Sequence, residues 1–186
     1  GIGNLDSSAK EFFLNLLDNL RIPVALTWGA KGLVPDQRDY LLGTFGTHGE
    51  RRANIAIQKS DLLLIFGSRL DTKATGTPIS TFSPHARKVM FDVDEKEFQK
   101  FSKFNAPIDK FIQMDFRQET SRSTIGSILD SKKDLNMRQS WLVEATKNTD
   151  ERSFRVSKPE FCEPYSLIEK LSNLAGEKTR VIIDTG

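Results

Sequence analysis

The sequence predicts an α/β protein, in which helices cover both faces of a doubly wound parallel β-sheet. Short apolar runs alternate along the chain with stretches whose apolar residues have helical spacing. Residues 62–66, Leu-Leu-Leu-Ile-Phe, contain no polar residue, which is typical of a strand buried on both faces. This run ends at Gly67, and open α/β sheets bind ligands beyond the carboxyl ends of their strands.

The composition excludes several classes of protein. The 186 residues are 38% hydrophobic and 28% charged, as in an ordinary globular protein. The 27 basic and 25 acidic residues are interspersed, which does not favour nucleic acid as a partner. The single cysteine, Cys162, excludes an internal disulfide framework and fits a reducing compartment. No signal peptide or membrane span is visible, so we expect a cytoplasmic protein without a membrane partner.

The first predicted helix starts with a capping-box pattern formed by Ser8 and Glu11. Its apolar residues lie on one stripe: Ala9, Phe12, Phe13, Leu16, Leu17 and Leu20. Pro23 ends the helix because proline disfavours a helical residue before it. A short strand is predicted over residues 24–28, and a loop-rich segment over 33–49.

The pattern continues with alternating helices and strands. A helix over about 50–59 buries Ala53, Ala56 and Ile57, and the strand 62–66 follows it. A polar loop over 73–84 precedes a strand at 88–94, one or two helical turns at 95–101 and a strand at 110–114. The next helix is marked by apolar residues at helical spacing, namely Ile125, Ile128 and Leu129.

We expect three segments along the chain. Residues 1–131 form the α/β domain, whose first strand is cut before the turn at Gly1-Ile2-Gly3. Residues 132–163 hold a short helix around Trp141 and a polar linker. Residues 164–186 hold a helix and a strand at 180–183, which begin a second domain. Both ends read as cut, so the chain is expected to be a piece of a larger protein.

Three segments carry candidate ligand-binding residues, and two of them lie at the ends of predicted strands. Gly67, Ser68 and Arg69 combine a turn, a hydroxyl and a guanidinium that can bind phosphate, although they also fit an ordinary turn with Arg69 paired to Asp71. Asp92 could hold a ribose or adenine edge, or be a surface acid.

The third candidate, Gly46-Thr47-His48, precedes a helix whose amino end can bind an anion. The alternative is that Thr47 caps this helix and His48 is a solvated loop residue.

No catalytic residue or metal ligand is predicted. The two histidines and the cysteine lack zinc-site spacing, and there is no P-loop or Gly-x-Ser-x-Gly motif. Asp184-Thr185-Gly186 lacks the partner acid and the all-β context of an aspartic protease.

Taken in order, the motifs resemble the central domain of the thiamine diphosphate-dependent enzymes of the acetolactate synthase type. The segments that carry the resemblance are 21–36, 42–43, 46–49, 53–56, 60–71, 75–76 and 91–94. Residues 181–186 resemble the first strand of that family's diphosphate-binding domain. The resemblance implies a Rossmann-like fold for the central domain.

The resemblance also implies what the longer parent does. The family has a pyrimidine-binding, a central and a diphosphate-binding domain. The resemblance implies that this chain lacks the first entirely and most of the third. The parent would be a lyase or transferase that cleaves or joins a carbon–carbon bond next to a carbonyl. It would use thiamine diphosphate and Mg²⁺, bound outside this chain, so the isolated chain is expected to be inactive. A homodimer or homotetramer is expected for the parent.

In this family the central domain binds FAD, or in some relatives ADP or a CoA-derived nucleotide, or nothing. The resemblance implies these nucleotide contacts: Thr27, Trp28, Gly46, Thr47, His48, Gly67, Ser68, Arg69, Asp92 and Val93. Thr47 stands where acetolactate synthases usually have methionine.

Two alternatives remain open on the sequence. The chain could be a structural and assembly module with a closed cleft beside Arg69. It could also be a dinucleotide-dependent oxidoreductase, which needs a complete Gly-x-Gly-x-x-Gly after its first strand, and Gly1-Ile2-Gly3 shows only a piece of that motif.

Overall fold

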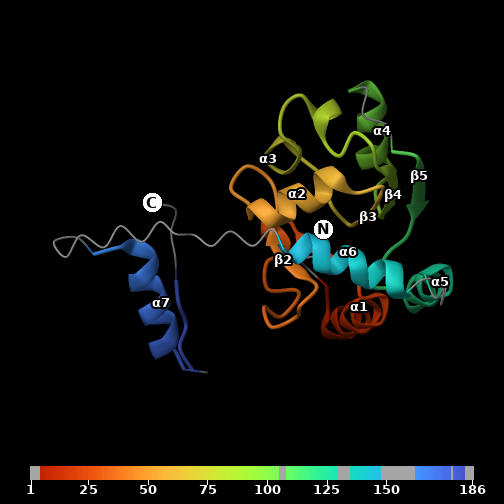
Figure 1. Cartoon of the computed structure of the whole chain (residues 1–186). Helices are drawn as coiled ribbons and strands as arrows, with labels where there is room; N and C mark the ends of the chain where they lie inside the picture. Colours follow the sequence, from red (N-terminus) through yellow and green to blue (C-terminus); the bar gives the residue numbers. More distant parts are fainter. Residues whose placement is uncertain (1–4, 105–107, 130–134, 148–161, 177, 183–186) are drawn as a thin grey trace. The chain divides into compact units, whose positions relative to one another are not determined.

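The computed structural model describes residues 5–104, 108–129, 135–147, 162–176 and 178–182, in two compact units divided after Thr149. In the first unit, helices surround short strands (Figure 1). Its elements are α1 (Ser7–Leu20), β1 (Val24–Leu26), η2 (Trp28–Ala30), β2 (Leu41–Thr44), α2 (Arg51–Lys59), β3 (Leu62–Phe66), α3 (Thr72–Thr75), η3 (Ile79–Thr81), β4 (Arg87–Asp92), α4 (Glu95–Lys103), β5 (Lys110–Gln113), α5 (Glu119–Leu129) and α6 (Leu135–Lys147).

The strands form two parallel sheets. β1 pairs with β2, and β4 lies between β3 and β5. In the larger sheet Leu64 lies opposite Val89, and Phe91 lies opposite Ile112. The predicted parallel α/β architecture is confirmed, but β1 and β3 are not paired, so the sheet is divided between them.

Helices cover both faces of the larger sheet, as predicted. Leu63 and Ile65 of β3 pack with residues of α2, α4 and α6, whereas Leu64 and Phe66 pack with residues of α1 and α5. The strand is less buried than its sequence predicts, since Ile65 is 4% exposed but Leu62 is 51% exposed. The reason is that, among the described strands, β3 is at the end of its sheet and has a neighbour on one side alone.

Helix α1 starts differently from the predicted capping box. The N-cap is Asp6, whose Oδ1 accepts a hydrogen bond from the N–H of Ala9 at 2.8 Å. A carboxylate there satisfies a helical N–H that has no partner within the helix, so the pattern at Ser8 is not needed. The predicted apolar stripe is confirmed on its inner side, where four residues are buried: Ala9, Phe13, Leu17 and Leu20.

The segment between the first two predicted strands contains a strand that the sequence analysis missed. β2 lies within the predicted loop 33–49, and it is short and contains Gly43, whose φ is +91°. Four residues with one glycine carry too little periodicity to be recognised as a strand. The following helix is confirmed, with Ala53, Ala56 and Ile57 buried as predicted.

Two other predicted segments are more ordered than expected. The predicted loop 73–84 contains most of the one-turn helix α3, which Asp71 caps by accepting the N–H of Ala74 at 3.0 Å. α4 extends over nine residues, two beyond the predicted end at residue 101, and Asp94 caps its start by accepting the N–H of Lys96.

The second unit contains helix α7 (Pro164–Leu174), as predicted, with Glu163 at its N-cap. Residues 180–182 are not in a strand, contrary to the prediction, and 183–186 lie outside the described residues. Val181 and Ile182 are exposed. A strand needs a neighbour to pair its backbone groups, and none pairs with this segment in the described part of the unit. Cys162, just before α7, is exposed and free.

Candidate ligand-binding edge

The predicted site residues follow the ends of four strands. Because paired strands are parallel, their carboxyl ends lie on one edge of each sheet. The β2–α2–β3 connection is a strand–helix–strand crossover, which normally carries the chain back in the same direction. We call the resulting surface the carboxyl edge; it comprises Thr27, Trp28, Gly46, Thr47, His48, Gly67, Ser68, Arg69, Asp92 and Val93.

An aromatic pair forms the carboxyl edge after β1 and β2. The rings of Trp28 and His48 are 6.5 Å apart between centroids and nearly perpendicular, at 87°. Both residues are exposed, Trp28 at 66%. The structure thus brings together two predicted residues from different loops, and it leaves an indole ring open to solvent.

Gly46 is fixed by a side chain that the site prediction omitted. Asn54 of α2 accepts the N–H of Gly46 at 2.8 Å and donates from Nδ2 to its carbonyl oxygen at 3.0 Å. Gly46 has φ +104°, and a Cβ there would lie 2.4 Å from the carbonyl oxygen of Lys73. Glycine is therefore required. The sequence feature that could have identified Asn54 is its position between the small buried residues Ala53 and Ala56.

Thr47 connects the loop after β2 to α3. Its N–H and its hydroxyl both donate to the carbonyl oxygen of Lys73, at 2.9 and 3.2 Å. The alternative in which Thr47 caps α2 is wrong, because Glu50 is the N-cap residue. The contact joins the loop after β2 in one sheet to the segment that follows β3 in the other.

Arg69 belongs to a charged cluster with α4. Its Nε donates to Oε1 of Glu97 at 3.1 Å, and Lys100 donates both to Glu97 and to the carbonyl oxygen of Arg69. The alternative pair of Arg69 with Asp71 is not formed, because Asp71 caps α3. The Arg69 side chain is 80% exposed and that of Glu97 only 16%. Glu97 and Lys100 were missed, although their i, i+3 spacing predicts an ion pair on a helix.

Asp92 holds the turn from β4 into α4. It is buried, and its Oδ1 accepts the N–H of Asp94 at 3.0 Å, so the alternative of a surface acid is wrong. The exposed Val93 accepts a hydrogen bond on its carbonyl oxygen from Nε2 of Gln113 at 3.1 Å. Gly67, with φ +51°, donates its N–H to the carbonyl oxygen of Phe91 at 2.8 Å.

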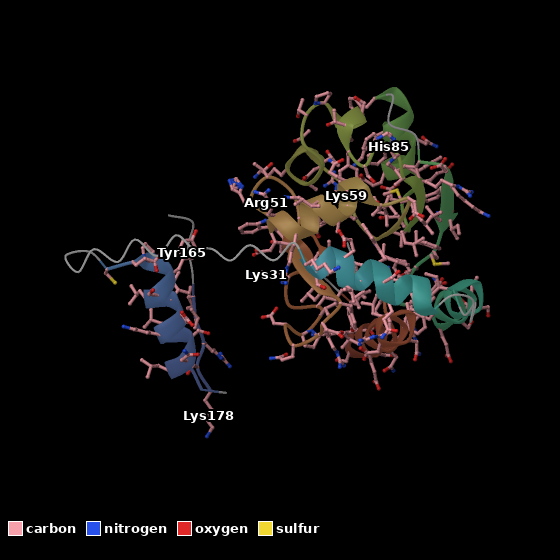
Figure 2. The ribbon with its side chains drawn as sticks, in the orientation of Figure 1. Lys31, Arg51, Lys59, His85, Tyr165 and Lys178 are labelled. Carbon is pink, nitrogen blue, oxygen red and sulfur yellow. The ribbon has the colours of Figure 1, made fainter. Side chains whose placement is uncertain are left out.

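A cavity of about 780 Å³ lies between β1 and β3. Thr27 and Ser68 of the carboxyl edge are among its lining residues. Lys59, labelled in Figure 2 on α2, lines it as well. Within the described ranges, no hydrogen bond or ion pair joins Trp28 or His48 to Arg69 or Asp92. The candidate residues therefore form two groups, one with Trp28 and His48 and the other with Arg69 and Asp92.

The described part of the chain has no group of three or more His, Cys, Asp or Glu side chains that could hold a metal ion. In the same residues, no helix combines the length and the apolar character needed to cross a bilayer.

Parallel strands covered by helices, with glycine turns at their carboxyl ends, define a Rossmann-like α/β domain. Residues 1–120 match the family model described as the central domain of the thiamine pyrophosphate enzymes. The chain therefore belongs to the thiamine pyrophosphate enzyme family, through its central domain, and the resemblance seen in the sequence is confirmed.

Similar proteins are acetolactate synthases. A probable acetolactate synthase large subunit of Methanocaldococcus jannaschii is 35% identical over 108 residues, 58% of this chain and 18% of that protein. An acetolactate synthase of Mycobacterium avium is 37% identical over 108 residues, 58% of this chain and 17% of that protein. Acetolactate synthase isozyme 2 large subunit of Escherichia coli is 39% identical over 80 residues, which are 43% of this chain and 14% of that protein. The chain thus matches less than a fifth of the length of each of these relatives.

Proposed function

We propose that the chain is the central, scaffolding domain of a thiamine diphosphate-dependent 2-oxoacid lyase or synthase, with a nucleotide-binding site at its carboxyl edge. The observation that carries the nucleotide site is the placement of exposed Trp28, His48 and Arg69 after β1, β2 and β3. Ligands of open α/β sheets bind at this edge. The names of the relatives, all acetolactate synthases, support the class of the parent enzyme.

The side chains at the carboxyl edge fit a nucleotide diphosphate of the FAD or ADP type. An exposed indole offers a flat face on which adenine or a flavin ring can stack. In the described interactions the Arg69 side chain donates only from Nε, so its two Nη groups can bind a diphosphate. Lys100 offsets the charge of Glu97, which leaves the cluster with a net positive charge.

The proposal assigns the carbon–carbon chemistry to the rest of the parent. Thiamine diphosphate supplies carbanion stabilisation when it is bound. Its site and that of Mg²⁺ belong, on this proposal, to the pyrimidine-binding and diphosphate-binding domains of the same polypeptide. The parent is a cytoplasmic homodimer or homotetramer, and the isolated chain is inactive.

Thermal unfolding with FAD, ADP and CoA, each added separately, tests the nucleotide site. A ligand at a hundred times its Kd stabilises the folded state by about 2.7 kcal/mol. For a domain of this size, that raises the Tm by about 5–10 °C. We expect one of the three nucleotides to produce this shift. Arg69→Ala should weaken it, and Arg87→Ala should not, since Arg87 is exposed at the start of β4, away from the carboxyl edge.

The second candidate function is a structural and assembly module without a ligand. It is favoured by the internal hydrogen bonds of Thr47 and Gly67, whose N–H groups donate to protein carbonyls. It predicts no Tm increase with any of the three nucleotides, and that result would remove the nucleotide site from the proposal.

A further inference from the structure

Arg69 is fixed at both its backbone and its guanidinium by two side chains of α4. Its Nε donates to Oε1 of Glu97 at 3.1 Å, and its carbonyl oxygen accepts a hydrogen bond from Nζ of Lys100. Lys100 also donates to the Glu97 carboxylate. The three side chains therefore form one connected cluster between the end of β3 and α4.

The exposures of the three side chains indicate which of them meets a ligand. Glu97 is mostly shielded from water and Lys100 is partly shielded, whereas the Arg69 side chain is largely exposed. An ion pair between two freely exposed side chains contributes little, because both must be ordered and water screens them. Here Lys100 already holds the acid, so Glu97 presents a fixed, charged acceptor to the guanidinium.

The residue after Arg69 adopts a backbone conformation that residues with a side chain rarely take. Leu70 has φ +46°, in the left-handed region, and its buried side chain packs in the same cluster as Met90 and Phe101. Such strain persists where surrounding contacts impose it, and it is concentrated at binding sites. The burial of Leu70 and the hydrogen bond from Lys100 impose it here, and Arg69 is left facing solvent.

Helix α4 is a rigid support for this cluster because the sheet sets its position. Asp94 caps its start by accepting the N–H of Lys96, and the buried Asp92 accepts the N–H of Asp94. Phe98 stacks on Phe111 of β5, with 5.2 Å between the ring centroids. A side chain held from such a helix keeps its geometry better than one held from a loop.

The contact with Glu97 determines which donors of Arg69 remain for a ligand. A guanidinium has five N–H donors in a planar fork, and the donor on Nε is taken by Glu97. A ligand must then meet the fork end-on, through Nη1 and Nη2. Two oxygens of a phosphate group fit this spacing.

We propose that Glu97 and Lys100 are positioning residues, which hold Arg69 ready to bind the diphosphate of the nucleotide end-on through its two Nη groups. This inference rests on the proposed nucleotide site and adds the means by which that site is preorganised. Arg69 touches the ligand, and the two α4 residues act only through Arg69. Binding to an arginine that the protein already holds avoids the loss of affinity that comes from ordering a long side chain.

Repulsion between Glu97 and a phosphate gives the opposite prediction. If charge alone mattered, removing the Glu97 carboxylate would tighten nucleotide binding. If Glu97 positions Arg69, its removal weakens binding, and it does so only while Arg69 is present.

A double-mutant cycle with ADP separates these effects. ADP is the probe because FAD and CoA both contain an adenosine diphosphate group. Titration calorimetry measures the Kd of the 186-residue chain, Arg69→Ala, Glu97→Ala and the double variant. We expect Glu97→Ala to weaken ADP binding about two- to tenfold, as expected when one long side chain must be ordered on binding. In the Arg69→Ala background the same change should alter the Kd by less than about twofold.

Two controls accompany the cycle. Glu95→Ala removes the same charge from an exposed position of the same helix, and it should leave the Kd unchanged or lower it slightly. Adenosine lacks the phosphates that Arg69 binds on this proposal. Its Kd should therefore be the same for Glu97→Ala and for the unaltered chain.

Lys100→Met tests the second positioning residue, since it removes the donor to the carbonyl oxygen of Arg69 and the partner of Glu97. We expect ADP binding to weaken about two- to tenfold. Lys96→Met removes the same charge from an exposed position of α4 and should have a smaller effect. Equal effects of the two variants would overturn the role of Lys100, because its charge alone would then account for the loss.

The failure of this inference can be told apart from the failure of the nucleotide site. Weakening by Glu97→Ala that is equal with and without Arg69 would indicate damage to α4, and tighter binding would indicate repulsion. Either result overturns the positioning role and leaves the nucleotide site standing. If ADP, FAD and CoA all fail to bind the unaltered chain, the nucleotide site is overturned and this inference with it.

If Glu97→Ala does not fold, NMR of the unaltered chain provides the test. The Nε–H of Arg69 should exchange with water more slowly than that of the exposed Arg87, because Glu97 accepts its hydrogen bond. Equal exchange rates of the two groups would overturn the proposal.

Discussion

At the scale of single residues, Asn54 determines the conformation of the loop after β2. Its side chain holds both backbone polar groups of Gly46, whose left-handed conformation brings the loop against Lys73. A helix residue thus controls a loop that carries three of the predicted ligand contacts, Gly46, Thr47 and His48.

Asn54→Ala should lower the free energy of unfolding by about 1–3 kcal/mol, because it removes two hydrogen bonds worth about 0.5–1.5 kcal/mol each. Asn54→Asp keeps the acceptor for the N–H of Gly46 but turns a carboxylate oxygen towards its carbonyl oxygen, so it should also destabilise the chain. Urea unfolding measures both changes, with Arg51→Ala at the exposed start of α2 as the control. An Asn54→Ala protein as stable as this control would refute the role of Asn54.

Tyr40 gives the first unit a dependence on alkaline pH. Burial, and then the hydrogen bond from its hydroxyl to Asp18 at 2.9 Å, raise the pKa of Tyr40 to about 12 from an ordinary value near 10. The unfolded chain loses this proton first. The contribution to stability is therefore complete below pH 10 and is lost as the pH rises towards 12.

Tyr40→Phe should remove this dependence. We expect the urea midpoint of the unaltered chain to fall more steeply between pH 10 and pH 12 than that of the Tyr40→Phe chain. Tyr165→Phe, at an exposed tyrosine of α7, is the control and should leave the slope unchanged. Parallel curves for Tyr40→Phe and the unaltered chain would contradict the assignment.

At the scale of secondary-structure elements, α1 is capped by Asp6, whereas the sequence pattern predicts a cap at Ser8. Asp6→Ala should destabilise the chain by about 0.5–2 kcal/mol, because the N–H of Ala9 loses its acceptor. Ser8→Ala should be close to neutral, since Ser8 lies inside the helix and is exposed. Thermal or urea unfolding of the two variants decides between them. A larger loss of stability for Ser8→Ala than for Asp6→Ala would support the predicted capping box instead.

Long, periodic elements were predictable from the sequence, and short ones were not. The stripe of α1 and the buried face of α2 follow from helical spacing, and the structure confirms both. β2 and α3 have four residues each, fewer than a periodic signal requires. Their conformation depends on partners far away in the sequence, such as Val24 for β2.

The candidate site was predictable to a similar degree. The strand ends before Trp28 and Arg69 can be located from periodicity, whereas His48 follows β2, which was not predicted. The partner of Arg69 was not predictable, because Glu97 lies 28 residues away and meets it only through tertiary packing. The near neighbour Asp71 was the natural expectation, but it caps α3.

At the scale of the whole molecule, the parallel α/β architecture was predictable, and the division of the sheet was not. Periodicity indicates which segments are strands, but pairing depends on which segments are present to pair. The apolar run of β3 predicts a central strand, yet β3 ends its sheet in this chain. The cavity between β1 and β3 lies where the sheet is divided.

The tryptophans and the cysteine lie in different units, which allows the distance between the units to be measured by energy transfer. Both tryptophans, Trp28 and Trp141, lie in the first unit, and the only thiol, exposed Cys162, lies in the second. A fluorescent acceptor attached to Cys162 would receive energy from the indoles without any engineered cysteine. The chain as it stands can therefore report, in solution, how far its two units lie apart and whether a nucleotide changes that separation.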